Sequence, residues 1–166
     1  IGFGTVGKGV VKNIISNGES IARRTGIRLE IARIADIDLE RERDVGVDPS
    51  LLTTDAEEIL HDDSLDIVVE LIGGIHPARE YVLTALRKGK SVVTANKALI
   101  SKHGIEIFET AREHGVDILY EASVAGCIPV VKSLRESLVA NKVLSINGIV
   151  NGTCNYILTR MQQDQM

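Results

Sequence analysis

The sequence predicts an α/β protein built on a doubly wound parallel sheet. Short runs of β-branched residues alternate with longer segments of helical periodicity, in the order β-α-β-α-β-α-β-α-β. A glycine-rich turn lies between the first run and the first helical segment, and small or polar residues follow the later runs. This alternation is typical of a parallel sheet with helices on both faces. Right-handed crossovers then place the loops that follow the strands on one edge of the sheet.

The glycine-rich turn comes first in the chain. Gly2, Gly4 and Gly7 have the spacing G-x-G-x-x-G, between Ile1, as the end of a buried strand, and a helix. In such a turn the first glycine allows a tight bend, the second leaves a surface without side chains, and the third lets the helix pack close to the strand. Backbone N–H groups at the start of the helix would face a pyrophosphate. The motif predicts a Rossmann-like dinucleotide site, with a tight turn that binds no ligand as the alternative.

The first helix is predicted over residues 5–17, where apolar residues recur every three or four positions. Gly18 could kink or end this helix, and Gly26 is expected to act as a C-cap. A run rich in β-branched residues predicts a strand over residues 27–35. The polar stretch 37–50 is expected to be a loop.

Asp36 stands at the end of the predicted strand 27–35. A carboxylate at this position can accept hydrogen bonds from the adenosine ribose of NAD. A solvated loop carboxylate is the alternative interpretation. Arg41 and Arg43 follow within the loop and could instead receive the 2′-phosphate of NADP, so both cofactors remain open.

The same criteria predict the remaining elements of the first part of the chain. They are a short helix at 55–60, a strand at 65–72 before Gly73 and Gly74, a helix at 78–88 with Pro77 in its first turn, a strand at 91–95, a helix at 98–114 that Gly104 could interrupt, and a strand at 116–120. The glycine-rich turn, Asp36, Gly73, Thr94 and the stretch 121–126 then share the edge of the sheet at which ligands bind.

After Gly126 the pattern changes. A helix is predicted at 129–138, an alternating strand at 143–150, a turn at 151–153, and a helix at 154–161 that Thr153 could cap. We expect a first domain over residues 1–126 and the beginning of an α+β substrate and dimerisation domain over residues 127–166. The sequence has no starting Met and begins within a predicted strand, so we expect it to be a fragment of a longer chain.

Composition excludes several classes of protein. The 166 residues are 44% hydrophobic and 25% charged, as in soluble globular proteins. A net charge of −4 gives no general attraction for nucleic acid or anionic lipid, and no apolar run approaches the roughly 18 residues of a membrane span. The two cysteines, Cys127 and Cys154, have no metal-ligand spacing. We expect them to be packed, reduced thiols in a reducing compartment, the cytoplasm.

Lys97 follows the predicted strand 91–95, at the edge where a nicotinamide ring would lie. A lysine there can move a proton to or from a substrate hydroxyl. A solvated residue at the start of a helix is the commoner explanation for a lone lysine after a strand, and only the surrounding motifs favour the catalytic role.

Glu121 lies between the last predicted strand and a loop of small residues. A carboxylate beside turned backbone carbonyls could hold a hard cation, with a helix cap or a salt bridge as the alternatives. The four histidines are scattered over loops and helix ends, and we expect them to be surface residues: His61, His76, His103 and His114.

Four motifs carry a resemblance to a known family. GFGTVG, VVTANKALIS, YEASVAGCIPVV and NGTCNYILTRM occur in this order and span nearly the whole sequence. Together they resemble homoserine dehydrogenase; many dehydrogenases share the first motif, whereas the other three are specific. The resemblance implies hydride transfer between L-homoserine, or L-aspartate 4-semialdehyde, and NAD or NADP, in the biosynthesis of threonine, methionine and isoleucine.

The resemblance also implies roles for individual residues. It implies cofactor contacts at Phe3, Thr5, Val6 and Lys97, a catalytic role for Lys97 as well, and substrate contacts at Gly152 and Thr153. It implies a sodium ion held by a glutamate and backbone carbonyls, at Glu121, Val124, Gly126 and Ile128. It further implies a homo-oligomer, either a dimer or a tetramer.

A second catalytic lysine, and the acidic residues that hold the homoserine amino group, belong to a later segment of the family that this sequence lacks. We therefore expect residues 1–166 to bind cofactor without independent catalysis. Aspartate-semialdehyde dehydrogenase is disfavoured, because neither cysteine has the histidine setting of a reactive thiol. A module that senses NAD(H) without turnover is the alternative from another class. It would explain the glycine-rich turn and Asp36, but not Lys97 or the motif at 151–157.

Overall fold

The computed structural model describes residues 1–41, 44–126, 128–149 and 151–164. These residues form two compact units, one over residues 1–120 and the other over residues 121–166. The predicted domain boundary at 126/127 remains a prediction. No helix among the described residues is both long and apolar enough to cross a membrane.

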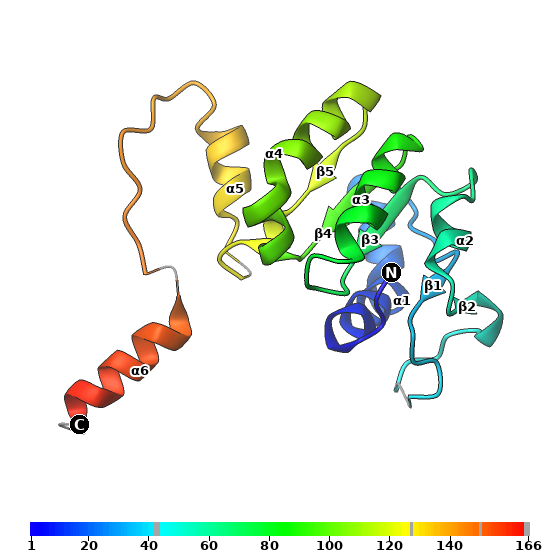
Figure 1. Ribbon diagram of the computed structural model, residues 1–166, viewed down its shortest axis with the longest axis horizontal. Coiled ribbons are helices and arrows are strands. Elements are labelled where there is room, and N and C mark those ends of the chain that lie inside the picture. The colour runs from blue at the N-terminus through cyan, green and yellow to red at the C-terminus, as the bar shows by residue number, and fades with distance from the viewer. Residues whose placement is uncertain (42–43, 127, 150, 165–166) are drawn as a thin grey trace. The chain divides into compact units, whose positions relative to one another are not determined.

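The first unit alternates strands and helices along the chain (Figure 1). Its elements are α1 (Thr5–Thr25), β1 (Ile34–Ala35), the 3₁₀-helix η1 (Pro49–Leu51), β2 (Leu52–Thr53), α2 (Ala56–Leu60), β3 (Ile67–Glu70), α3 (Ala78–Arg87), β4 (Ser91–Thr94), α4 (Lys97–His114) and β5 (Ile118–Leu119). This order confirms the predicted alternation.

All strand pairs among the described residues of this unit are parallel. β1 pairs with β2, while β3, β4 and β5 form a second ladder in that order. Ile1 and Gly2 join the two ladders: the Ile1 nitrogen donates to Val69 O at 2.7 Å, Ile1 O accepts from Leu71 N, and Gly2 N donates to Ala35 O at 2.8 Å. Donation to one residue and acceptance from the second residue after it is the parallel pattern. The resulting order is β2-β1-(Ile1–Gly2)-β3-β4-β5, a Rossmann-like sheet.

The core divides between the two faces of this sheet. Ile34 packs with Phe3 of the glycine turn and with Val11 of α1, whereas the next residue, Ala35, packs in the larger cluster beneath α2, α3 and α4. Successive residues of a strand point to opposite faces, so β1 contributes to both clusters. The figure shows α2, α3 and α4 side by side (Figure 1). Both faces are therefore covered, as a doubly wound fold requires.

Several predicted boundaries are corrected. The strand expected over 27–35 is limited to Ile34–Ala35, because only these residues find a ladder partner, and the strand expected over 116–120 is limited to Ile118–Leu119. Neither Gly18 nor Gly104 interrupts its helix, while Gly26 caps α1 in the left-handed conformation as predicted. β2 lies in a stretch for which no strand was predicted.

The described elements of the second unit are all helical. They are the 3₁₀-helix η2 (Glu121–Ser123), α5 (Val130–Lys132), the single π-helical turn η3 (Ser133–Ser137) and α6 (Gly152–Gln163). The strand predicted at 143–150 is wrong for residues 143–149, which form no regular secondary structure; residue 150 lies outside the described residues. Asn151, rather than Thr153, caps α6, because its side chain accepts from Cys154 N at 2.8 Å.

Candidate functional site: the carboxyl edge of the parallel sheet

The three glycines of the first turn have distinct geometric roles. Gly2 has φ +96°, and a Cβ there would lie 2.7 Å from the Leu71 carbonyl carbon. A Cβ at Gly7 would lie 2.1 Å from Gly2 O, so only glycine lets α1 approach the turn. A Cβ at Gly4 would meet nothing within 4 Å. The first and third glycines are therefore required by packing, and the second leaves the start of α1 open to a ligand.

The start of α1 has the properties of an anion site. Gly4 is the N-cap residue and has no side chain with which to satisfy the first N–H groups, and the first turn contains no acidic residue. Thr5 and Val6 are exposed there. The N–H groups and the helix dipole suit a phosphate. Phe3 differs from these neighbours, because its side chain is buried against α1 and contributes to the core instead of the pocket.

Asp36 is bound to the glycine turn. One carboxylate oxygen accepts from Phe3 N at 2.5 Å, and the other accepts from Asp38 N at 2.9 Å. The side chain thus fixes the turn to the end of β1. A carboxylate at this end of a strand can accept hydrogen bonds from the ribose of a dinucleotide. Arg41 donates its backbone N–H to Asp38, and Arg43 lies outside the described residues.

A pocket of about 380 Å³ opens beside this turn. Its wall combines the turn, the ends of β1 and β3, and the start of α3; the lining residues are Ile1, Gly2, Gly4, Ala35, Asp36, Ile37, Thr54, Ala56, Leu71, Ile72, Gly73, His76, Pro77 and Tyr81. Apolar walls with one carboxylate match a planar base attached to a ribose. The predicted residues Gly2, Gly4, Asp36 and Gly73 are thus brought together.

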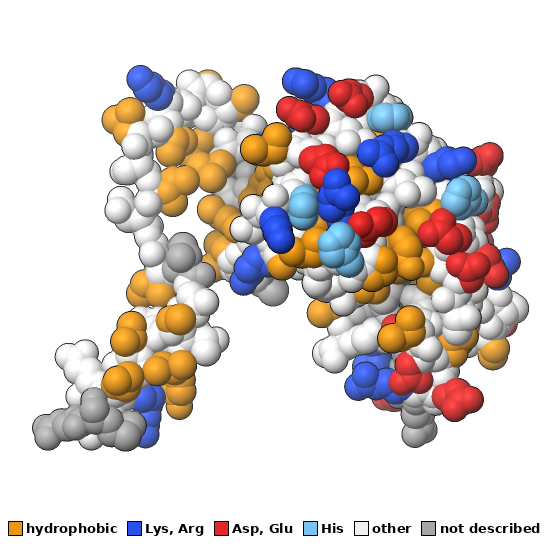
Figure 2. All heavy atoms as spheres, in the orientation of Figure 1, with side chains coloured by type: hydrophobic (Ala, Val, Ile, Leu, Met, Phe, Trp, Pro, Cys, Tyr) orange, Lys and Arg blue, Asp and Glu red, His pale blue; other side chains and the backbone are white. Residues whose placement is uncertain are grey.

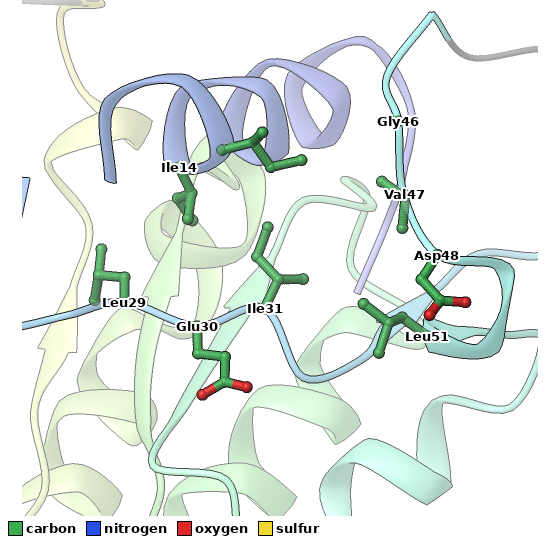
Figure 3. Close-up of a pocket in the computed structure, with 9 residues that line it drawn as sticks. Ile14, Leu29, Glu30, Ile31, Gly46, Val47, Asp48 and Leu51 are labelled. Atoms are coloured by element: carbon green, nitrogen blue, oxygen red, sulfur yellow. The ribbon is translucent and has the colours of Figure 1, made fainter. Parts of the chain in front are cut away.

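A second hollow, of about 290 Å³, lies away from these residues (Figure 3). Ile14 of α1 faces Leu29 and Ile31 there, with Val47 and Leu51 on the opposite side. None of the predicted site residues lines this hollow. The pocket at the carboxyl edge is therefore the candidate site.

A buried carboxylate that we did not predict lies beneath the site. Glu70, at the end of β3, is fully buried and accepts from Ile72 N, Gly73 N and the Thr94 hydroxyl. Thr94 is also fully buried, so its side chain supports the site from below and does not face the pocket. The alternation pattern of the strand gave no sign of this role, because a glutamate within a β-branched run carries no local signal of burial.

Lys97 is the first residue of α4 and is exposed. The preceding residue, Asn96, caps the helix by accepting from Leu99 N at 3.1 Å. Lys97 therefore stands at the carboxyl end of β4, on the same edge as Gly73. This location agrees with the predicted position, and its contact with cofactor remains a prediction.

In the second unit, Glu121 caps a helix. Its two carboxylate oxygens accept from Val131 N at 3.0 Å and from Lys132 N at 2.8 Å. This arrangement is the cap that the sequence left open as an alternative to a cation ligand. The backbone turns sharply nearby, with positive φ at Ala125 and Gly126.

The other predicted metal and substrate residues also belong to the second unit. Val124 N donates to Glu121 O, and Ile128 O accepts from Val130 N at 2.8 Å. Gly152 and Thr153 are exposed at the start of α6. Among the described residues, no group of three or more His, Cys, Asp or Glu side chains could hold a metal. The sodium site and the substrate contacts remain predictions.

The histidines mostly follow the prediction. His61 and His114 are exposed. His76 is exposed too, but it lines the pocket and contacts Glu80 at 2.9 Å. His103 is partly buried and joins an ion-pair cluster in which Arg79 binds Glu106. Figure 2 shows that, on the face of the molecule in view, acidic, basic and histidine side chains are interspersed. Cys154 is exposed, which corrects the expectation that it is packed, and Cys127 lies outside the described residues.

The fold and the glycine geometry define a dinucleotide-binding protein of the Rossmann class. Residues 2–121 match the NAD-binding domain of homoserine dehydrogenase, and residues 129–166 match the homoserine dehydrogenase domain that follows it. The chain therefore belongs to the homoserine dehydrogenase family, as its motifs predicted.

Curated relatives and solved structures agree with this assignment. The chain is 50% identical to homoserine dehydrogenase of Corynebacterium glutamicum over 97% of its residues and 49% identical to that of Pseudomonas aeruginosa over 98%. It matches a crystal structure of a homoserine dehydrogenase from Thiobacillus denitrificans with a TM-score of 0.90 and 45% identity, covering 98% of this chain and 38% of the other. The chain spans 36% and 37% of the two curated relatives.

Proposed function

We propose that the complete protein interconverts L-homoserine and L-aspartate 4-semialdehyde with NAD or NADP. The observation that carries the proposal is the joint match of both parts of the chain to one family, supported by the glycine geometry of the turn. The relatives named above are homoserine dehydrogenases, enzymes that act on a CH–OH group. The biosynthesis of threonine, methionine and isoleucine is the corresponding metabolic role.

The residues at the carboxyl edge would divide the work as follows. The start of α1 would bind the pyrophosphate, and the carboxylate of Asp36 would bind the adenosine ribose. The cofactor, when bound, accepts or supplies the hydride. Lys97 would hold the substrate hydroxyl and move its proton. Its amino group is suited to this role because Lys97 follows the carboxyl end of β4, on the edge of the sheet where the pocket opens. Holding the two reacting groups together supplies much of the rate.

The finer parts of the proposal concern the second unit and the assembly. Gly152 and Thr153 would contact homoserine. Glu121 and the carbonyls of Val124, Gly126 and Ile128 would hold sodium, through the lone pairs that the cap bonds leave on the carboxylate. The protein would be cytoplasmic and homo-oligomeric, and residues 1–166 alone would bind cofactor without turnover.

The test is an absorbance assay at the NADH band, with the complete protein, homoserine and each of the two cofactors. Formation of NADH or NADPH that depends on homoserine is the expected result. Binding of NADH without any turnover would instead favour a sensing module. For the sodium site, Glu121→Gln should reduce the dependence of the rate on sodium relative to potassium; an unchanged dependence would rule out the site.

A further inference from the structure

We propose that Glu70 is a positioning residue that holds Lys97 and the Gly73–Gly74 loop in one geometry. The inference rests on the proposed function for its catalytic part. Glu70 is fully buried and is not among the residues that line the pocket, so its role is exerted through its hydrogen-bond partners.

The carboxylate of Glu70 connects two loops. Oε1 accepts from Ile72 N at 3.0 Å and from Gly73 N at 3.2 Å, at the start of the loop that lines the pocket. Oε2 accepts from the Thr94 hydroxyl at 2.6 Å, at the end of β4. Bonds to a buried carboxylate are strong, and a buried donor that loses its acceptor is costly. The position of the loop is thereby tied to the end of the neighbouring strand.

Asn96 extends this connection to the helix that carries Lys97. The Thr94 hydroxyl accepts from Asn96 N at 3.0 Å, and Asn96 Nδ2 donates to Gly74 O at 2.6 Å and to Glu70 Oε1 at 3.5 Å. The side-chain oxygen of Asn96, Oδ1, accepts from Leu99 N and thereby caps α4. Lys97 follows Asn96 directly, so its backbone is anchored on the same network. A network with every member bonded is rigid.

Because the network connects the pocket loop to the helix that carries Lys97, a single substitution within it should affect both cofactor binding and turnover. Glu70→Gln keeps the shape of the side chain but replaces one acceptor oxygen by a donor. That donor must face either the Thr94 hydroxyl or the N–H groups of Ile72 and Gly73. Thr94→Val removes the hydroxyl at constant shape, which leaves Oε2 without its donor and Asn96 N without its acceptor.

The experiment measures kcat, KM and the Kd for NADH in the complete protein. We expect Thr94→Val and Glu70→Gln to lower kcat about tenfold or more, since misplacement of a catalytic group by about 1 Å can cost about a hundredfold. Thr94→Ser keeps the hydroxyl group, so this variant should retain most of the wild-type kcat. Thr110→Val is the matched control: Thr110 is a buried residue of α4 whose hydroxyl donates to Glu106 O, far along the helix from Lys97.

Combination with Lys97→Ala separates positioning from general loss of stability. If Glu70 acts through Lys97, Glu70→Gln should lower kcat little further in a Lys97→Ala protein. Additive losses, or a Thr94→Val protein that matches Thr110→Val in kcat at equal melting temperature, would overturn the inference.

NADH binding decides the matter independently of turnover. Glu70→Gln should raise the Kd for NADH about fivefold or more, because the Gly73–Gly74 loop lines the pocket. Lys90→Met, which removes a buried amine at the opposite end of β4, should leave this Kd unchanged. A wild-type protein without homoserine turnover refutes the proposed function but not this inference. An unchanged Kd in Glu70→Gln refutes the inference whether or not the wild type turns over.

Discussion

At the scale of single residues, the glycine turn gives the sharpest test of the site. Gly7→Ala would place the new methyl group 2.1 Å from the carbonyl oxygen of Gly2, which is too close for two non-bonded atoms. The helix must then shift, and we expect a loss of about 1–3 kcal/mol in the free energy of unfolding. NADH binding should fall at least about tenfold, because the start of α1 moves with the helix.

Gly9 provides the matched control within α1. A Cβ at Gly9 would meet nothing within 4 Å, and the residue lies in the helix interior. Gly9→Ala should therefore stabilise the protein by about 0.5–1 kcal/mol and leave NADH binding unchanged. Denaturant unfolding and fluorescence titration measure both quantities. Equal effects of the two substitutions would mean that the close approach at Gly7 does not matter.

Lys97→Ala tests the catalytic assignment. Removal of a group that moves the substrate proton should lower kcat about a hundredfold or more in the complete protein. The melting temperature should hardly change, since Lys97 is exposed. Lys102→Ala, at another exposed lysine of α4, is the control and should retain full activity. Near-normal turnover of Lys97→Ala would refute its role.

The same scale shows what the sequence could and could not reveal about the site. The tight turn at Gly2, the open surface at Gly4 and the close packing at Gly7 were predictable because they follow from spacing along the chain. Glu70 was not, because its burial and its bond to the Thr94 hydroxyl depend on pairing of β3 with β4. Thr94 was placed correctly at the edge, but its side chain points into the network below the pocket.

At the scale of elements, α1 shows how a glycine can be neutral or required. Gly18 lies within the continuous helix and a Cβ there would meet nothing, whereas Gly26 ends the helix with φ +75°. Gly18→Ala should raise the free energy of unfolding by about 0.5–1 kcal/mol. Gly26→Ala should lower it by about 1–2 kcal/mol, because a side chain is strained in the left-handed region. Opposite signs in denaturant unfolding are the expected result; equal signs would contradict this account of the helix.

The strands predicted over 27–35 and 116–120 were harder to delimit than the helix predicted over 98–114. Helical hydrogen bonds are local, so the periodicity of 98–114 sufficed to predict α4 almost to its bounds. A strand needs a partner distant in sequence, and the β-branched residues at 27–33 have none in the ladder. The same reason explains residues 143–149, whose alternating side chains lie exposed: Val143, Leu144, Ile146 and Ile149. β-propensity describes a fit to a half-buried surface and does not supply that surface.

At the scale of the whole molecule, carboxylates that bind local donors predict loss of stability in acid. The Ser64 hydroxyl and backbone N–H hold the pKa of Asp62 below its ordinary value of 3.8, and the backbone N–H of Ser50 does the same to the pKa of Asp48. A group whose pKa is lower in the folded state stabilises the fold above its unfolded pKa, and this contribution is lost as the pH falls further.

The melting temperature should therefore fall as the pH drops through and below 3.8. Asp62→Asn combined with Asp48→Asn should make this fall shallower, because the amides do not titrate. Thermal unfolding of wild type and double variant, from about pH 5 to about pH 2, measures the two slopes. Parallel curves would show that other carboxylates dominate.

The distribution of the core predicts which part of the chain folds alone. Both clusters of buried apolar side chains belong to residues 1–120. Among the described residues after 120, no apolar side chain is buried, and Leu144, Tyr156 and Leu158 are exposed. Burial of apolar surface is the main favourable term in folding.

Residues 1–120 should therefore unfold cooperatively and bind NADH as an isolated fragment, since the glycine turn, Asp36 and Gly73 all lie within it. Residues 121–166 alone should lack a cooperative transition in calorimetry. Failure of residues 1–120 to fold under conditions in which residues 1–166 fold would contradict this prediction.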